Sequence, residues 1–147
     1  MQEEPYQFER PTTEICYNFK SLSQEKTVNK RVTFTSADFQ NIYHLALLDV
    51  LNDGSTSDIT ETRNKDMKTV LATVLKIVKD FLDRNSGNII VFKGSDKRRH
   101  RLYRLLLTRE LSMIQQGFNV FGIILSQERP ELFQADQDYE YYLITKK

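Results

Sequence analysis

The stretch from Asp66 to Ser95, DMKTVLATVLKIVKDFLDRNSGNIIVFKGS, decides the fold class. Its apolar residues recur at helical spacing over residues 66–84, which predicts an amphipathic helix whose polar face includes Thr73. The turn residues Asn85-Ser-Gly87 predict the end of that helix. The apolar run at 88–92 then predicts a short strand near the centre of a sheet.

Strands are expected on the N-terminal side of this helix. Apolar and polar residues alternate over 14–22 and again over 30–35, which is typical of strands with one buried face. The apolar segment 41–51 fits a helix or a strand. The turn signal Asn52-Asp-Gly54 behind it favours a hairpin, with a short strand at Ile59 and Thr60.

The C-terminal side continues with a second helix from residue 96 to about residue 116. An apolar strand is expected at 118–125, an acidic loop at 126–138 and a last strand at 139–145. The order predicts an α+β fold: an antiparallel meander, then helix, strand, helix and strand, with both amphipathic helices packed on the sheet.

Length and composition place limits on domain number and location. Of 147 residues, 39% are hydrophobic, which is enough for the core of one domain. The polar start predicts a flexible N-terminal arm over 1–11, followed by a single domain over 12–147. No apolar run is long enough for a membrane span. One cysteine, Cys16, and no apolar leader favour the cytoplasm.

A strongly basic segment is the main functional signal. Residues 93–109 hold seven basic residues and one acidic residue, while the whole chain has a net charge of +1. A strand is expected to run into a helix start here, where free backbone N–H groups favour anions. Gly94 would let a ligand approach the backbone, and Ser95 or Asp96 would cap the helix. The candidate anion-binding residues are Lys93, Gly94, Ser95, Arg98, Arg99, Arg101 and Arg104, with Arg99 the first choice.

Several functions remain open at this point. The basic helix face is either simply solvated or binds nucleic acid, another polyanion or an acidic protein surface. The acidic segment 128–140 of a second copy would serve as such a surface and give a homo-oligomer. The element order also resembles that of ribonuclease-H-like metal nucleases, with Asp49 and Asp96 as candidate ligands. Asn18 and Lys20 stand in the first strand where such nucleases need Asp. We therefore expect a binding module rather than an enzyme, with no cofactor and no metal.

A family resemblance rests on several spaced segments, among them Val70–Val74, Phe118–Gly122 and the pattern K-G-S-x-x-x-R-x-R-L-Y beginning at Lys93. Over residues 6–147 the chain resembles a family of small bacterial proteins, chiefly from the Bacteroidetes, known only as a domain of unknown function. The resemblance implies a single α+β domain in the cytoplasm and supplies no activity. This chain has Asp96 where the family tends to have Thr, a change that makes the helix start less favourable for anions.

Overall fold

A computed structural model describes residues 5–6, 8–9, 15–22, 27–37, 41–57, 67–84, 87–94 and 96–147. The chain forms two compact units. Unit 1 comprises Met1–Thr35 and Leu45–Phe81, and unit 2 comprises Ser36–His44 and Leu82–Lys147. The single domain expected over 12–147 stays a prediction.

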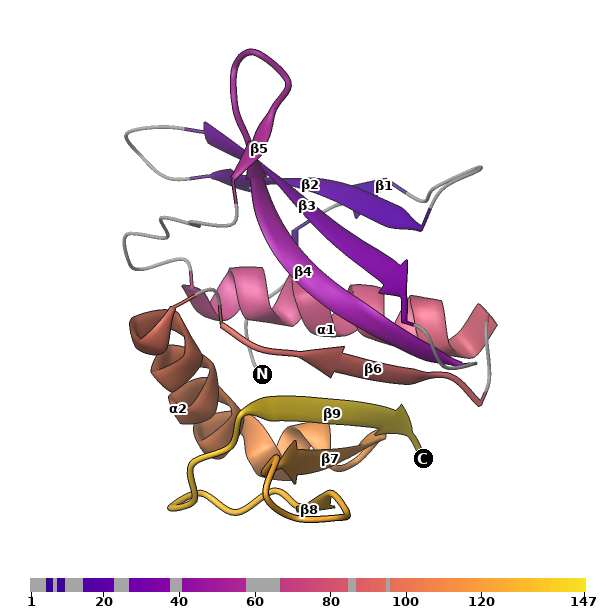
Figure 1. The fold of residues 1–147 in the computed structure, drawn as a ribbon. Helices are drawn as coiled ribbons and strands as arrows, with labels where there is room; N and C mark the ends of the chain where they lie inside the picture. Colours follow the sequence, from indigo (N-terminus) through magenta and orange to yellow (C-terminus); the bar gives the residue numbers. More distant parts are fainter. Residues whose placement is uncertain are drawn as a thin grey trace. The chain divides into compact units, whose positions relative to one another are not determined.

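Unit 1 is a sheet with one long helix on one face. Its strands, in spatial order, are β1 (Phe8–Glu9), β2 (Cys16–Leu22), β3 (Thr27–Ser36), β4 (Ile42–Val50) and β5 (Thr56–Ser57). Strand β4 begins in unit 2 and continues through unit 1. The helix is α1 (Met67–Arg84), and Figure 1 shows it crossing the strands of this unit.

The core of unit 1 forms because alternate residues of β2 and β3 turn toward α1. In the antiparallel register Tyr17 lies opposite Val32, and both are buried. The ring of Phe34 stacks on that of Phe81 in α1, with ring centroids 4.1 Å apart. The Tyr17 hydroxyl donates to the Asp80 carboxylate at 2.8 Å. This alternation confirms the predicted strand pattern.

Thr73 lies in this core, so its predicted place on the polar face of the helix is wrong. Its hydroxyl donates to the Thr69 carbonyl at 2.8 Å and accepts the Tyr6 N–H at 2.7 Å. The side chain is therefore buried with its hydrogen bonds made, which removes most of the cost of burying it. Because the Tyr6 ring also stacks on Phe19, part of the expected N-terminal arm packs on unit 1.

A buried ion pair links β3 to β4. The Lys30 ammonium donates to Asp49 Oδ1 at 2.7 Å, and the exposed fractions of the two side chains are 0% and 11%. Two charges removed from water in this way are stable only as a pair. Lys30 takes an inward position opposite Phe19, where the alternation alone predicts an apolar residue.

Unit 2 consists of further strands of the same sheet and a second helix. Its elements are β6 (Ile89–Phe92), α2 (Lys97–Ile114), β7 (Phe118–Ile123), β8 (Glu131–Leu132) and β9 (Tyr141–Lys146). The strand order is β4-β6-β9-β7-β8. Strand β6 runs parallel to the first residues of β4 and antiparallel to β9. The residues of α2 that are buried are Leu106, Leu107 and Ile114.

The predicted α+β class is confirmed. The predicted and observed elements differ mainly where the periodicity of apolar residues is weak. The second helix ends at Ile114 rather than near residue 116, and Met113 in its last turn is 39% exposed. A two-residue strand, β8, lies inside the acidic loop, because it pairs with β7 across the hairpin. The strand expected at Ile59 and Thr60 lies outside the described residues. Among those that are described, neither helix is long and apolar enough to cross a membrane.

The buried pair gives a stability prediction. Replacing Asp49→Asn leaves the Lys30 ammonium buried without a counter-charge, so we expect urea unfolding to show a loss of about 3–5 kcal/mol. The control is Asp83→Asn, which removes the exposed pair between Lys146 and Asp83 and should cost less than about 1 kcal/mol. Equal effects of the two substitutions would contradict the importance of burial. The double variant K30M/D49L should recover most of the loss.

Candidate functional site

The start of α2 is capped by a carboxylate of the chain itself. Asp96 has extended backbone, and its Oδ1 accepts the Arg99 N–H at 2.8 Å. This confirms the predicted cap at Asp96, whereas Ser95 lies outside the described residues. A negative charge therefore already occupies the positive end of the helix dipole, so a second anion is less favourable there.

The structure gives Gly94 a different role from the predicted one. A Cβ added at Gly94 would lie 2.2 Å from the backbone nitrogen of His100 and 2.7 Å from the carbonyl carbon of Arg99. The space expected for a ligand is thus filled by the first turn of α2. Glycine is required here because the strand end and the helix approach each other so closely.

His100 holds this junction together. The Gly94 N–H donates to His100 Nδ1 at 3.0 Å, so Nδ1 acts as an acceptor and the ring proton lies on Nε2. Nε2 then donates to the Tyr139 carbonyl at 2.5 Å. The imidazole also stacks on the Tyr142 ring at a centroid distance of 4.7 Å. A neutral imidazole thereby joins β6, α2 and the segment before β9.

Burial among aromatic side chains beneath α2 raises the pKa values of two tyrosines. Tyr142 is fully buried, and its hydroxyl donates to the His100 carbonyl at 3.2 Å. Burial is the main reason that the pKa of Tyr142 rises to about 12. Burial also raises the pKa of Tyr103, whose ring meets Phe92 edge-on, while the nearby Arg99 charge partly opposes that rise. These rings therefore belong to the core of unit 2.

Two of the candidate arginines face acidic groups. Arg99 Nε lies 3.8 Å from Asp96 Oδ2, and 18% of the Arg99 side chain is exposed. Arg104 pairs with Asp138, which lies in the acidic segment after β8. Arg99, the first choice from sequence, is therefore a half-buried residue at the helix cap. The carboxylate beside each of these two arginines offsets its positive charge, which weakens its attraction for an anionic ligand.

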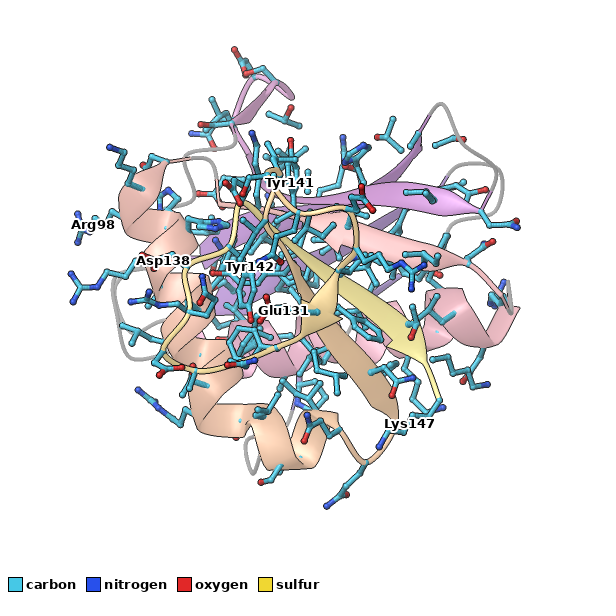
Figure 2. All side chains as sticks on the ribbon, turned by 60° about the horizontal axis from the view of Figure 1, so that its bottom comes forward. Arg98, Glu131, Asp138, Tyr141, Tyr142 and Lys147 are labelled. Atoms are coloured by element: carbon cyan, nitrogen blue, oxygen red, sulfur yellow. The ribbon has the colours of Figure 1, made fainter. Side chains whose placement is uncertain are left out.

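Three acidic side chains of the segment 128–140 make contacts within unit 2. Asp138 pairs with Arg104, Glu140 accepts the Leu125 N–H at 3.2 Å, and Glu131 accepts the Tyr139 hydroxyl at 3.0 Å. Figure 2 shows Glu131 and Asp138 on the segment that runs beside α2. These contacts reduce the number of carboxylates that could meet a second copy of the chain.

A row of exposed residues, three of them arginines, runs along one side of α2. Residues spaced three or four apart share one face of a helix, and here five such residues are all exposed. We call this row the α2 stripe; it consists of Arg98, Arg101, Leu105, Arg109 and Ser112. Figure 2 shows Arg98 extending outward from α2, away from Tyr142.

The stripe contains only part of the predicted site. Arg98 and Arg101 lie in it, while Lys93 is exposed at the end of β6 with its ammonium 5.2 Å from the centre of the Tyr141 ring. Leu105 was not among the candidates although 48% of it is exposed. Its position between two arginines at helical spacing is the signal that identifies it.

The candidate metal ligands each have a protein partner. Asp49 pairs with Lys30 in unit 1, and Asp96 caps α2 in unit 2. Within the part of the chain that the structure describes, no three His, Cys, Asp or Glu side chains group so as to hold a metal ion. The described residues thus offer no support for the nuclease alternative.

Fold and site together define a small α+β protein with an arginine-rich, solvent-facing helix. The chain belongs to the family of unknown function DUF6934, whose model matches residues 2–147. This confirms the resemblance to a family of unknown function. Searches of curated proteins and of solved structures gave no significant match.

The close approach at Gly94 gives a second prediction. Gly94→Ala should cost about 1–3 kcal/mol in urea unfolding, because the added methyl group meets helix backbone that cannot move aside easily. Gly117→Ala is the matched control: a Cβ there meets nothing within 4 Å, so its effect should be close to zero or slightly stabilising. A Gly94→Ala protein as stable as the control would show that the junction is loosely packed.

Tyr142 gives a prediction for alkaline pH. Its pKa in the folded protein is about 12, above the value of about 10 for an unfolded tyrosine. The stabilisation from its neutral phenol is therefore complete below about pH 10 and is lost as the pH rises toward 12. Tyr142→Phe should flatten this decline in the free energy of unfolding. Identical alkaline profiles for the two proteins, followed by tyrosinate absorbance and denaturant titration, would refute the assignment.

Proposed function

We propose that this protein is a non-enzymatic binding module that holds nucleic acid or another polyanion on the α2 stripe. The supporting observation is that three exposed guanidinium groups, those of Arg98, Arg101 and Arg109, share one helix face without a carboxylate in the row. Guanidinium groups bind phosphates through paired, charge-assisted hydrogen bonds. A face of this kind gains affinity mainly by releasing the counterions that surround a polyanion.

The ends of the stripe extend the basic surface. Lys97 is exposed in the first turn of α2, next to Arg98, and Lys93 is exposed a few residues before it. The ammonium of Lys93 rests near the Tyr141 ring, which limits how far that side chain moves. We infer that Lys93 supports binding at the N-terminal end of the row, and that Arg99 and Arg104 contribute less because acids face them.

An acidic protein surface is the second candidate for the same stripe. The observation that favours it is Leu105, which is 48% exposed between Arg101 and Arg109. Arginine is enriched at protein interfaces, and the buried centre of an interface is more apolar than its rim. Leu105→Ala would weaken such a complex strongly, whereas phosphate contacts would depend on it little.

We also propose that the protein works in the cytoplasm of a bacterium of the Bacteroidetes. The single cysteine supports the location, and the sequence resemblance described above supports the origin. The spaced pattern from Lys93 to Tyr103 is the segment in which we expect related proteins to agree best.

Oligonucleotide titration tests the proposed function. We expect binding of the full chain at low salt, with log K falling as log salt rises. The variant R98Q/R101Q should reduce the steepness of that line by about 1.8, because each lost phosphate contact contributes about 0.9. Fluorescence anisotropy with a labelled oligonucleotide measures both quantities.

The matched control is K20Q/K76Q, which removes the same charge from two exposed lysines of unit 1. It should bind as the unaltered protein does. Binding that ignores salt, or an equal loss in both double variants, would show that the α2 stripe is not the site.

A further inference from the structure

We infer that the α2 stripe binds double-stranded nucleic acid through its phosphate backbone, without preference for sequence. This inference rests on the proposed function and narrows it to one class of ligand. It is carried by three features of the described residues: the packing of the aromatic side chains, the spacing of the arginines and the rigidity of α2.

The aromatic side chains do not provide a platform for unpaired bases. Proteins that hold single strands stack bases on exposed aromatic rings. Every Phe and Tyr whose side chain the structure describes is buried or half-buried. Near the stripe, Tyr142 stacks on His100, Tyr103 meets Phe92, and Tyr139 packs against Phe133. The rings of Tyr142, Tyr103 and Tyr139 therefore belong to the core of unit 2.

The arginines are spaced along a straight row. Arg98 and Arg109 are eleven residues apart on one face, so their Cα atoms are separated by about 16 Å along the helix axis. Arg101 lies between them, one turn from Arg98. A duplex carries one phosphate charge per roughly 1.7 Å of its axis. A row of this length therefore faces several phosphates at once, at positions that the duplex itself fixes.

The helix that carries the row is held rigidly. Its opposite face is buried through Leu106, Leu107 and Ile114, and its first turn is fixed by the contacts of Gly94 with His100. Because the helix backbone is already fixed, only the arginine side chains lose conformational freedom on meeting a rigid ligand. A flexible single strand would have to be ordered on the same surface without stacking, so it should bind less tightly.

The composition of the row argues against reading of bases. Leu105 lies between Arg101 and Arg109, and Ser112 follows Arg109. The row has no Asn or Gln to pair with adenine and no acid to pair with cytosine, and its arginines can pair with guanine only where they leave the phosphates. Contacts to phosphate fix position but carry no sequence information. We therefore expect affinity to depend on duplex structure and salt, and not on base order.

The test compares four labelled ligands with equal numbers of negative charges. These are a duplex DNA, a duplex RNA, one strand of the DNA alone, and heparin. At least one duplex should bind about five-fold or more tighter than the single strand, since no stacking compensates the ordering of that strand. With three arginine contacts the slope of log K against log salt for duplex DNA should be about −2.7. Shuffling the duplex sequence should leave the affinity unchanged.

A single substitution at the far end of the row tests its length. Arg109→Gln should reduce the steepness of the duplex slope by about 0.9, while Lys76→Gln, which removes the same charge from α1, should not change it. Circular dichroism of both variants checks that the helices remain folded.

The outcomes separate the two proposals. Equal or tighter binding of the single strand or of heparin would overturn duplex recognition and leave polyanion binding standing. An Arg109→Gln slope equal to that of the unaltered protein would also overturn it, because the row would then end near Arg101. Absence of salt-dependent binding to all four ligands would overturn both proposals.

Discussion

The packing of α2 in unit 2 depends on the hydrogen bonds and ring stacking of the His100 imidazole. This imidazole accepts a hydrogen bond from Gly94, donates one to the Tyr139 carbonyl and stacks on Tyr142, so the end of β6, the start of α2 and the distant segment leading into β9 meet at one ring. Because both ring nitrogens and one ring face are used, α2 has a fixed rotation about its axis. That rotation turns Leu106 and Leu107 inward and leaves the α2 stripe in solvent. The position of the proposed binding surface is thus a consequence of buried polar contacts on the other side of the same helix.

Among the residues that the structure describes, ion pairs neutralise some of the charged side chains in each unit, but not the arginines of the α2 stripe. In unit 1 the Lys30 ammonium is buried against Asp49, and in unit 2 Asp96 and Asp138 face Arg99 and Arg104. The net charge of +1 counts these paired groups in the same way as exposed ones. Each pair, however, neutralises its own charges within the protein. What remains is local: an arginine row with no acid in it. The net charge of +1 therefore does not describe α2, where three exposed arginines share one helix face with no acid in the row.

Much of the fold follows from local patterns, and the candidate site follows only in part. Periodicity predicts α1, β2 and the Asp96 cap, because each depends on residues close in sequence. The burial of Thr73, the pairing of Arg104 with Asp138 and the use of Gly94 for helix packing depend on segments tens of residues apart or on close backbone approach. No local pattern contains that information. Arg98 and Arg101 could be named from sequence, whereas the exposure of Leu105 and the bridging role of His100 required the structure.

Strand β8 has a consequence for how copies of this chain meet. It consists of Glu131 and Leu132 alone, it stands at the end of the strand order in unit 2, and it follows Pro130, which has no backbone N–H to donate. A short, proline-flanked, charged edge offers few free backbone groups, which is a common protection against the addition of a foreign strand. Sheet extension from one molecule to the next is thereby disfavoured on this side. On a polyanion that held several copies as proposed, this edge would therefore not be where their sheets join.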